Sequence, residues 1–138
     1  MIIFQSYNYS PSLKSNNNEK KSSVQEQTYI PDDNFEAALI SFGYDDVLDD
    51  YVITSNISSL KSLKLNDRQI LDPTGIQDFI ELTDLSFTNN LLTSLDISNN
   101  KALKNLEIND NFLTSIGVSN HTELILFSLY NNNINSID

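Results

Sequence analysis

The chain has 138 residues with 19 acidic and 8 basic side chains, one His and no Cys, which gives a net charge of −11. This charge argues against a nucleic-acid partner, because such binding depends on clustered Lys and Arg, and without Cys there are no disulfides or thiolate metal sites. No uninterrupted apolar run exceeds four residues, whereas a transmembrane helix needs about 20. We therefore expect no transmembrane segment.

The first 27 residues differ in composition from the rest of the chain. Residues 5–27 are rich in Gln, Ser, Asn, Lys and Glu and contain few large apolar groups. Such a segment buries too little apolar surface to offset the entropy lost on ordering. The opening Met-Ile-Ile-Phe lacks the basic start and long apolar core of a signal peptide. Residues 1–27 are thus predicted to be a disordered tail or the remnant of an export signal.

Residues 28–59 are predicted to form an N-terminal cap around a helix over about residues 33–42. Asp33 and Glu36 have the spacing of a capping box, and acids in a first turn suit the helix dipole. Gly43 stands where glycine commonly ends a helix, and residues 52–54 are expected to form a short strand. One helix face is apolar; it carries Phe35, Ala38, Leu39 and Phe42.

Other groups that could carry chemistry give weak signals. Residues 45–50 contain four Asp, and oxygen-rich clusters can bind Ca²⁺. Their spacing does not match a calcium loop, which favours a solvated turn over a weak Ca²⁺ site. His121 is expected on the surface of a turn. One His and three well-separated Gly supply no catalytic triad, phosphate loop or two-His metal motif, so we predict a non-enzymatic protein without cofactor or metal.

A repeated pattern begins at Leu60 and continues to the end of the chain. Leu82, Leu103 and Leu124 are 21 residues apart, and each opens a version of L-x-x-L-x-L-x-x-N-x-L. In the first, imperfect copy Arg68 occupies the Asn position. This is the leucine-rich-repeat pattern. Residues 60–138 are therefore predicted to form an α/β solenoid: a horseshoe of 21-residue coils with short parallel concave strands and few helices outside the N-terminal cap.

The residue types in the repeat have physical reasons. Apolar residues two positions apart, such as Leu85 and Phe87, fit a strand with one buried face. An Asn after each strand can donate to and accept from backbone groups left unpaired by the turn, which predicts a ladder of Asn90, Asn111 and Asn132. No C-terminal cap follows the last repeat, so we expect a truncated chain or a piece of a longer one. The exposed strand edge there is expected to promote end-to-end self-association.

The stretch from Ile30 to Phe79, with IPDDNFEAALISFGYDD, ISSLKSLKL and TGIQDF, resembles the cap and first repeat of internalin-type bacterial leucine-rich-repeat proteins. The later LTSLDISNNKAL resembles tandem repeats of secreted proteins from Bacteroidetes-type bacteria. The resemblance covers roughly residues 29–138, and Arg68 departs from it. It implies a secreted or surface-attached bacterial module that binds other proteins, often within a longer chain carrying separate anchoring or sorting domains.

The residues that alternate with the core Leu are expected to face solvent on the concave sheet. Leu126 and Tyr130 are either anchors of a binding patch or packing surface for a following coil. The leading hypothesis is non-catalytic binding of a protein, or of a glycan, on this face. The alternative is a structural spacer or cap fragment of a longer surface-anchored protein, with no ligand of its own. The predicted partner-binding residues are Lys64, Asn66, Asp84, Ser86, Thr88, Asn105, Glu107, Asn109, Leu126, Ser128 and Tyr130.

Overall fold

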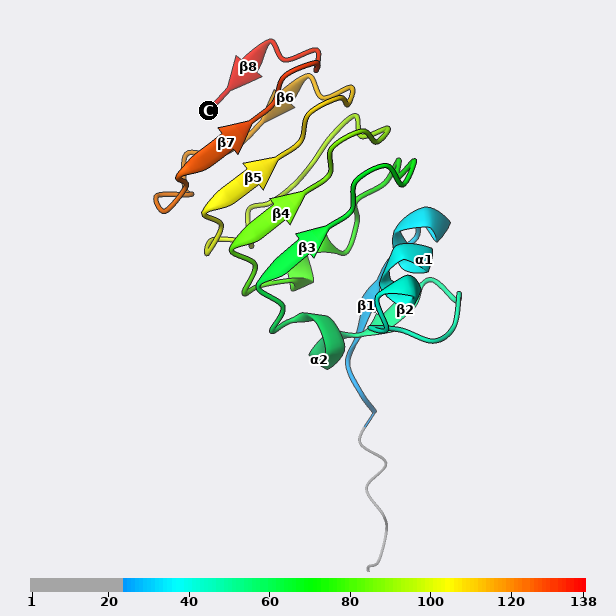
Figure 1. The fold of residues 1–138 in the computed structure, drawn as a ribbon. Coiled ribbons are helices and arrows are strands. Elements are labelled where there is room, and N and C mark those ends of the chain that lie inside the picture. The colour runs from blue at the N-terminus through cyan, green and yellow to red at the C-terminus, as the bar shows by residue number, and fades with distance from the viewer. Residues whose placement is uncertain (1–23) are drawn as a thin grey trace, which may run out of the picture.

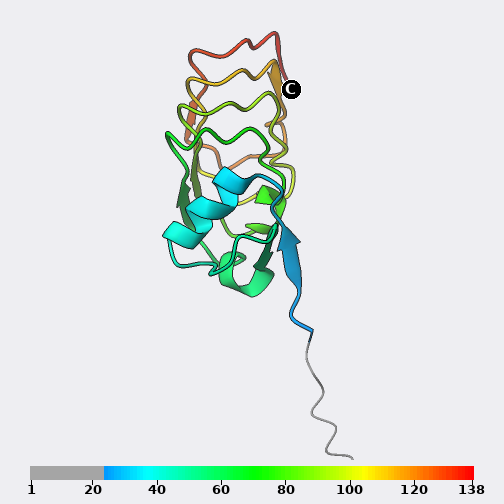
Figure 2. The ribbon, with the colours of Figure 1, turned by 90° about the vertical axis from the view of Figure 1, so that its right-hand side faces the viewer.

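A stack of short coils with a cap at its N-terminal end makes up the computed structural model, which describes residues 24–138 (Figure 1). Most of the predicted tail, residues 1–23, lies outside the described residues. In a view turned by 90°, the coils are seen to lie one above another, and the cap helix lies toward the N-terminal end of the stack (Figure 2). No helix within residues 24–138 has the length and apolar character needed to cross a membrane.

The cap contains two helices and a small antiparallel sheet. Its first strand, β1, begins inside the segment predicted to be tail, and it pairs with β2 so that Thr28 lies opposite Val52. The strand expected over residues 52–54 is β2, one residue earlier. The helix expected over residues 33–42 is α1. The bounds of the cap elements are β1 Gln27–Tyr29, α1 Asp33–Ser41, β2 Tyr51–Ile53 and α2 Thr54–Ile57.

The start of α1 differs from the predicted capping box. Asp32, not Asp33, is the N-cap, and its Oδ1 accepts hydrogen bonds from the backbone N–H groups of Asn34 and Phe35, each at 3.0 Å. Its Oδ2 accepts from the N–H groups of residues 71 and 72, at 2.8 and 3.0 Å, in the first coil. Buried Glu36 accepts instead from the N–H groups of residues 49–51. Both carboxylates therefore connect the helix to other segments.

Four strands form the concave parallel sheet, in the order β3-β4-β5-β7. The register pairs Leu63 with Leu85, Leu85 with Leu106 and Leu106 with Phe127. The last two steps are 21 residues each, whereas the first is 22 because of one extra residue near Pro73. The parallel strands and the few helices confirm the leucine-rich-repeat solenoid. The strands are β3 Ser62–Lys64, β4 Asp84–Ser86, β5 Asn105–Glu107 and β7 Leu126–Ser128.

The opposite side of the stack carries little regular structure. One 3₁₀ turn, η1 (Ile76–Asp78), lies in the first coil. Two short parallel strands, β6 (Ser115–Ile116) and β8 (Ser136–Ile137), pair in the last coils. This agrees with the expectation that 21-residue coils leave little room for helices.

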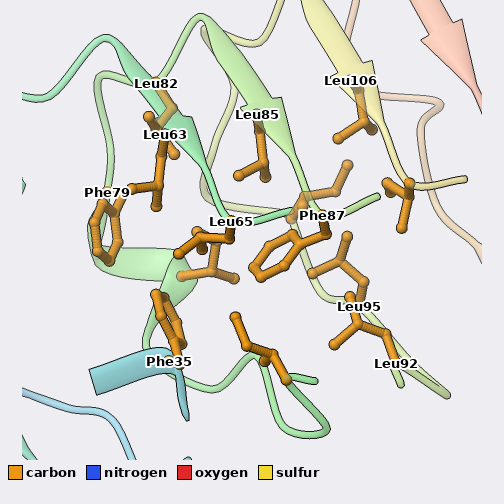
Figure 3. Close-up of a cluster of buried hydrophobic side chains, with 14 of the residues drawn as sticks. Phe35, Leu63, Leu65, Phe79, Leu82, Leu85, Phe87, Leu92, Leu95 and Leu106 are labelled. Atoms are coloured by element: carbon orange, nitrogen blue, oxygen red, sulfur yellow. The ribbon is translucent and has the colours of Figure 1, made fainter. Parts of the chain in front are cut away.

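Apolar side chains from both sides of the coils meet in one continuous core (Figure 3). Phe35 brings the cap helix into this core, because its ring lies 6.0 Å from that of Phe79 and 6.1 Å from that of Phe87. Burial weakens in the last coil, where Phe127 and Leu129 are only partly buried. Labelled core residues include Leu63, Leu65, Leu82, Leu85, Leu92, Leu95 and Leu106.

The Asn residues that follow the strands join each coil to the one before it. Asn90 donates from Nδ2 to the carbonyl of Leu65 at 2.7 Å and accepts at Oδ1 from the N–H of Ile70 at 3.0 Å. Asn111 and Asn132 repeat this geometry one and two coils later. Arg68 lacks this amide; its guanidinium lies 5.3 Å from the centre of the Phe42 ring in the cap.

Candidate binding face on the concave sheet

The register brings most of the predicted binding residues together on one face. The outward side chains of all four strands contribute to it, because in-register parallel strands place equivalent residues side by side. A depression of about 280 Å³ lies in the middle of this face. Its lining residues are Lys64, Asn66, Asp84, Leu85, Ser86, Asn105, Glu107 and Leu126.

The Asp84 carboxylate is the best-connected charged group in the depression. It accepts hydrogen bonds from the Thr83 hydroxyl, at 2.6 Å, and from the Asn105 amide. The hydrogen bond from Thr83 is the largest cause that lowers the pKa of Asp84, followed by that from Asn105 and by the charges of Lys64 and Lys104. Asp84 therefore remains ionised near neutral pH and supplies a fixed negative charge to the face.

Two predicted face residues are buried, so the expectation that they point to solvent is wrong. Ser86 and Asn109 are 6% and 5% exposed. Asn109 Oδ1 accepts from the Ser128 hydroxyl at 2.7 Å and from the N–H of Tyr130 at 3.1 Å. Asn66 makes the same two bonds to Ser86 and to the N–H of residue 88. These polar groups are used in joining coils, which leaves fewer of them for a partner.

The accessible part of the face changes character along the stack. Lys64, Asp84 and Glu107 give the first three strands a polar, mixed-charge surface. In the last coil Leu126 is 44% exposed and Tyr130 is 61% exposed. The face thus combines charged groups at the cap end with exposed apolar groups at the other end.

His121 was expected on the surface, but the structure shows it buried, with 6% of its surface exposed. Its Nε2 lies 3.0 Å from the carbonyl oxygen of Ile97. Asn100, 21 residues earlier, donates in the same way to the carbonyls of Ile76 and Phe79, at 2.8 and 3.0 Å. The two side chains occupy equivalent positions in consecutive coils. His121 therefore joins coils on the side opposite the concave sheet.

The acidic segment over residues 45–50 shows no arrangement suited to a cation. Within the described part of the chain, no three His, Asp or Glu side chains come close enough together to hold a metal ion. Burial raises the pKa of the Asp45 carboxyl, opposed by a backbone hydrogen bond from Asp46 and supported by the charge of Asp49. The segment is a turn beside the cap helix.

Comparison with known proteins agrees with this architecture. No protein-family model matches the chain. Internalin J of Listeria monocytogenes serotype 4b (strain F2365) is 35% identical over 72 residues, which is 52% of this chain. The solved functional domain of InlJ from Listeria monocytogenes, which includes a cysteine ladder, superposes with a TM-score of 0.73 and 30% identity over 83% of this chain. The chain therefore has the leucine-rich-repeat fold of the internalins and is similar to Internalin J in sequence.

A second internalin has a similar fold. The crystal structure of InlF from Listeria monocytogenes strain 4b F2365 gives a TM-score of 0.69 at 25% identity and covers 78% of this chain. The chain spans only 8% of the length of Internalin J, and 26% and 32% of the solved InlJ and InlF chains. Unlike the InlJ domain with its cysteine ladder, this chain has no Cys, and Asn side chains join its coils.

Proposed function

We propose that this chain is a non-catalytic module that binds a partner protein on its concave face. The observation that carries the proposal is that one depression is lined by side chains from β3, β4, β5 and β7 together. A surface made from four separate strands is broad and rigid, which suits recognition of another protein. The accessible residues assigned to binding are Lys64, Asp84, Asn105, Glu107, Leu126 and Tyr130.

Charged and apolar residues of the face are expected to contribute differently, the charged ones to specificity and the apolar ones to affinity. Fixed charges such as Asp84 and Glu107 select a partner with complementary charge and orient its approach. Exposed Leu126 and Tyr130 provide apolar area of the kind that carries most of the energy at interfaces. We therefore expect a partner with a basic or mixed-charge region next to an apolar one. No step of this function requires a cofactor or a metal.

The proposal is tested by probing an array of extracellular proteins with the labelled chain and with two variants. The double variant Glu107→Lys/Tyr130→Ala should lose the specific signal. The control Glu123→Lys/Phe112→Ala makes the same two kinds of change at exposed positions outside the depression, and it should keep the signal. A specific partner bound equally by the wild type and the double variant would rule out the concave face.

The chain is also proposed to act outside the bacterial cell, as a secreted or surface-attached protein, because it is similar to the internalins in sequence and fold. The alternative function is that of a structural spacer within a longer surface-anchored protein. That alternative is favoured if neither the protein array nor a glycan array yields a specific signal. A glycan ligand would give a signal on the second array alone.

Self-association through the last coil is a separate proposal. It is supported by the exposure of Ile125, which directly precedes β7, and of Ile137 in β8, at 83% and 54%. Light scattering at several concentrations tests it, since mass should rise with concentration in the wild type. The substitution Ile125→Ser should reduce that rise.

A further inference from the structure

The strand next to the cap has an unpaired edge. β3 pairs only with β4, and in a parallel pair alternate residues direct their N–H and C=O groups to opposite sides. Lys61 and Leu65 bond to the second coil, through Lys61 O and Leu65 N. Ser62 and Lys64 therefore point their backbone groups toward the cap, where no backbone partner meets them within residues 24–138. Both residues are exposed.

A slot separates this edge from the cap. It has a volume of about 210 Å³, with Ser62, Leu63 and Lys64 on one side and Phe42 and Tyr44 on the other. The two rings are in edge-to-face contact, with centroids 6.1 Å apart. Aromatic walls facing a free strand edge match the way extended peptides are bound by strand addition.

The wall of the slot is fixed to the rest of the molecule. Tyr44 is held through its backbone, because its N–H donates to Leu39 at 3.0 Å and its carbonyl accepts from the Asn56 amide at 3.0 Å. The Arg68 guanidinium packs on the Phe42 ring. A wall held in this way loses little entropy when a ligand binds.

The geometry points to a second contact site, at which an extended segment of a partner protein adds to the free edge of β3. Side chains of an added strand would alternate between the concave surface and the slot. Side chains of the added strand that lie beside Lys64 would face its ammonium group. This ammonium makes no ion pair within the described residues, where the one ion pair is Lys61–Glu81. Those on the other side would contact Leu63, Phe42 and Tyr44. The segment that fits best is therefore a carboxylate flanked by two apolar, β-branched residues.

The test uses NMR on the ¹⁵N-labelled 138-residue chain with the blocked peptide Ser-Val-Glu-Val-Ser as probe. Shift changes at millimolar peptide should concentrate on Ser62, Lys64, Phe42 and Tyr44, and the amides of Ser62 and Lys64 should exchange more slowly with solvent. Two further peptides carry N-methyl groups, one on Glu and one on both Val. Only one of them should lose binding, because only one set of N–H groups faces β3, and the one that fails gives the direction of the added strand.

Protein variants provide the second part of the test. Ser62→Pro removes an edge N–H that β4 does not use and that an edge strand can spare, so binding should weaken about five- to tenfold without a change in the urea midpoint. Lys64→Glu should weaken the Glu peptide and leave a Gln version unaffected. Equal binding by both N-methylated peptides, absence of the shifts, or protection of Ser62 and Lys64 without peptide would overturn the proposal.

This inference rests on the proposed function only in requiring a protein partner, and the two can fail separately. The Glu107→Lys/Tyr130→Ala variant should bind the peptide as the wild type does, because neither residue lines the slot. Ser62→Pro should leave recognition by the concave depression unchanged, because Ser62 does not line it. Loss of one activity without the other identifies which site is wrong.

Discussion

The two ends of the solenoid are covered to very different extents. In the first coil Leu63 and Leu65 are 2% and 0% exposed, because α1 and the following coils enclose them. In the last coil the equivalent Phe127 and Leu129 remain partly exposed, and Leu126 beside them is 44% exposed. The apolar strand positions of the repeat are filled in both coils. Burial in a repeat protein therefore depends on the neighbours of a coil as much as on its own residues.

The largest expected effect is at the covered end, where Gly75 touches the cap. Its φ is +100°, and an added Cβ would lie 2.2 Å from Ile30 Cδ1 and 2.6 Å from the carbonyl oxygen of Tyr29. Gly75→Ala should therefore cost on the order of 3–5 kcal/mol, measured by urea unfolding. Gly43→Ala is the matched control, because it also has positive φ, at +80°, but nothing lies within 4 Å of its added Cβ. Equal losses for both variants would show that contact with the cap is unimportant.

The next prediction compares core positions in the two regions. Leu106→Ala empties a fully buried site in β5 and should cost roughly 2–5 kcal/mol. Phe127→Ala removes a larger side chain from the less covered coil, and should nevertheless cost less than Leu106→Ala. The free energies of unfolding from urea titration give the comparison. If Phe127→Ala were the more damaging, the last coil would be as well enclosed in solution as the central ones.

The Asn ladder gives a smaller and graded effect. Asn111→Ala leaves the buried N–H of Leu92 without its partner and removes one of two hydrogen bonds to the carbonyl of Phe87, which keeps the bond from Asn90. The change should cost about 1–3 kcal/mol. The same change at Asn132, whose surroundings are more accessible to water, should cost less. Chemical denaturation measures both. If neither substitution changed the free energy of unfolding, the register of the coils described above would be wrong.

The smallest expected effect is the response of Asp84 to pH. The pKa of Asp84 in the folded protein lies below the ordinary value for an Asp carboxyl. The ionised carboxylate therefore contributes stability that is fully present above the ordinary pKa and is lost as the pH falls through the folded-state pKa. The carboxylate lies on an accessible face, where such contributions are about 1 kcal/mol or less. Asp84→Asn should thus lower stability at neutral pH and match the wild type in acid. A constant difference across the acid range would exclude this linkage.

The repeat could be read from the sequence because its signal is periodic and local. Leu and Asn at fixed spacing determine the strand, the turn and the direction of each side chain, so the register of the coils follows. The sequence carries a further signal, an Asp or Asn directly before each Asn position. The structure shows these residues in the left-handed conformation that Asp and Asn tolerate best; they are Asp67 (φ 59°), Asn89 (58°), Asp110 (54°) and Asn131 (55°).

Features that depend on contacts between distant segments were not predictable in the same way. β1 forms because β2 pairs with it, although its own composition resembles the tail. Asp32 caps α1 while also holding the first coil, a role that spacing along one helix does not reveal. For the candidate site, the sequence indicated which side chains lie next to one another on the parallel sheet but not that Asn109 is already used in hydrogen bonds to the next coil. The equivalence of His121 and Asn100 was visible as a spacing of 21 residues.

The Asn ladder also relates the order in which the coils are synthesised to the order in which their polar groups find partners. Each ladder amide reaches back to the carbonyl and N–H groups of the preceding coil, as Asn90 does to Leu65 and Ile70. During synthesis the amino-terminal part of a chain emerges first and starts to fold first. A newly made coil keeps unpaired polar groups until the next Asn arrives. Each ladder Asn that emerges thus completes the polar contacts of the coil made before it.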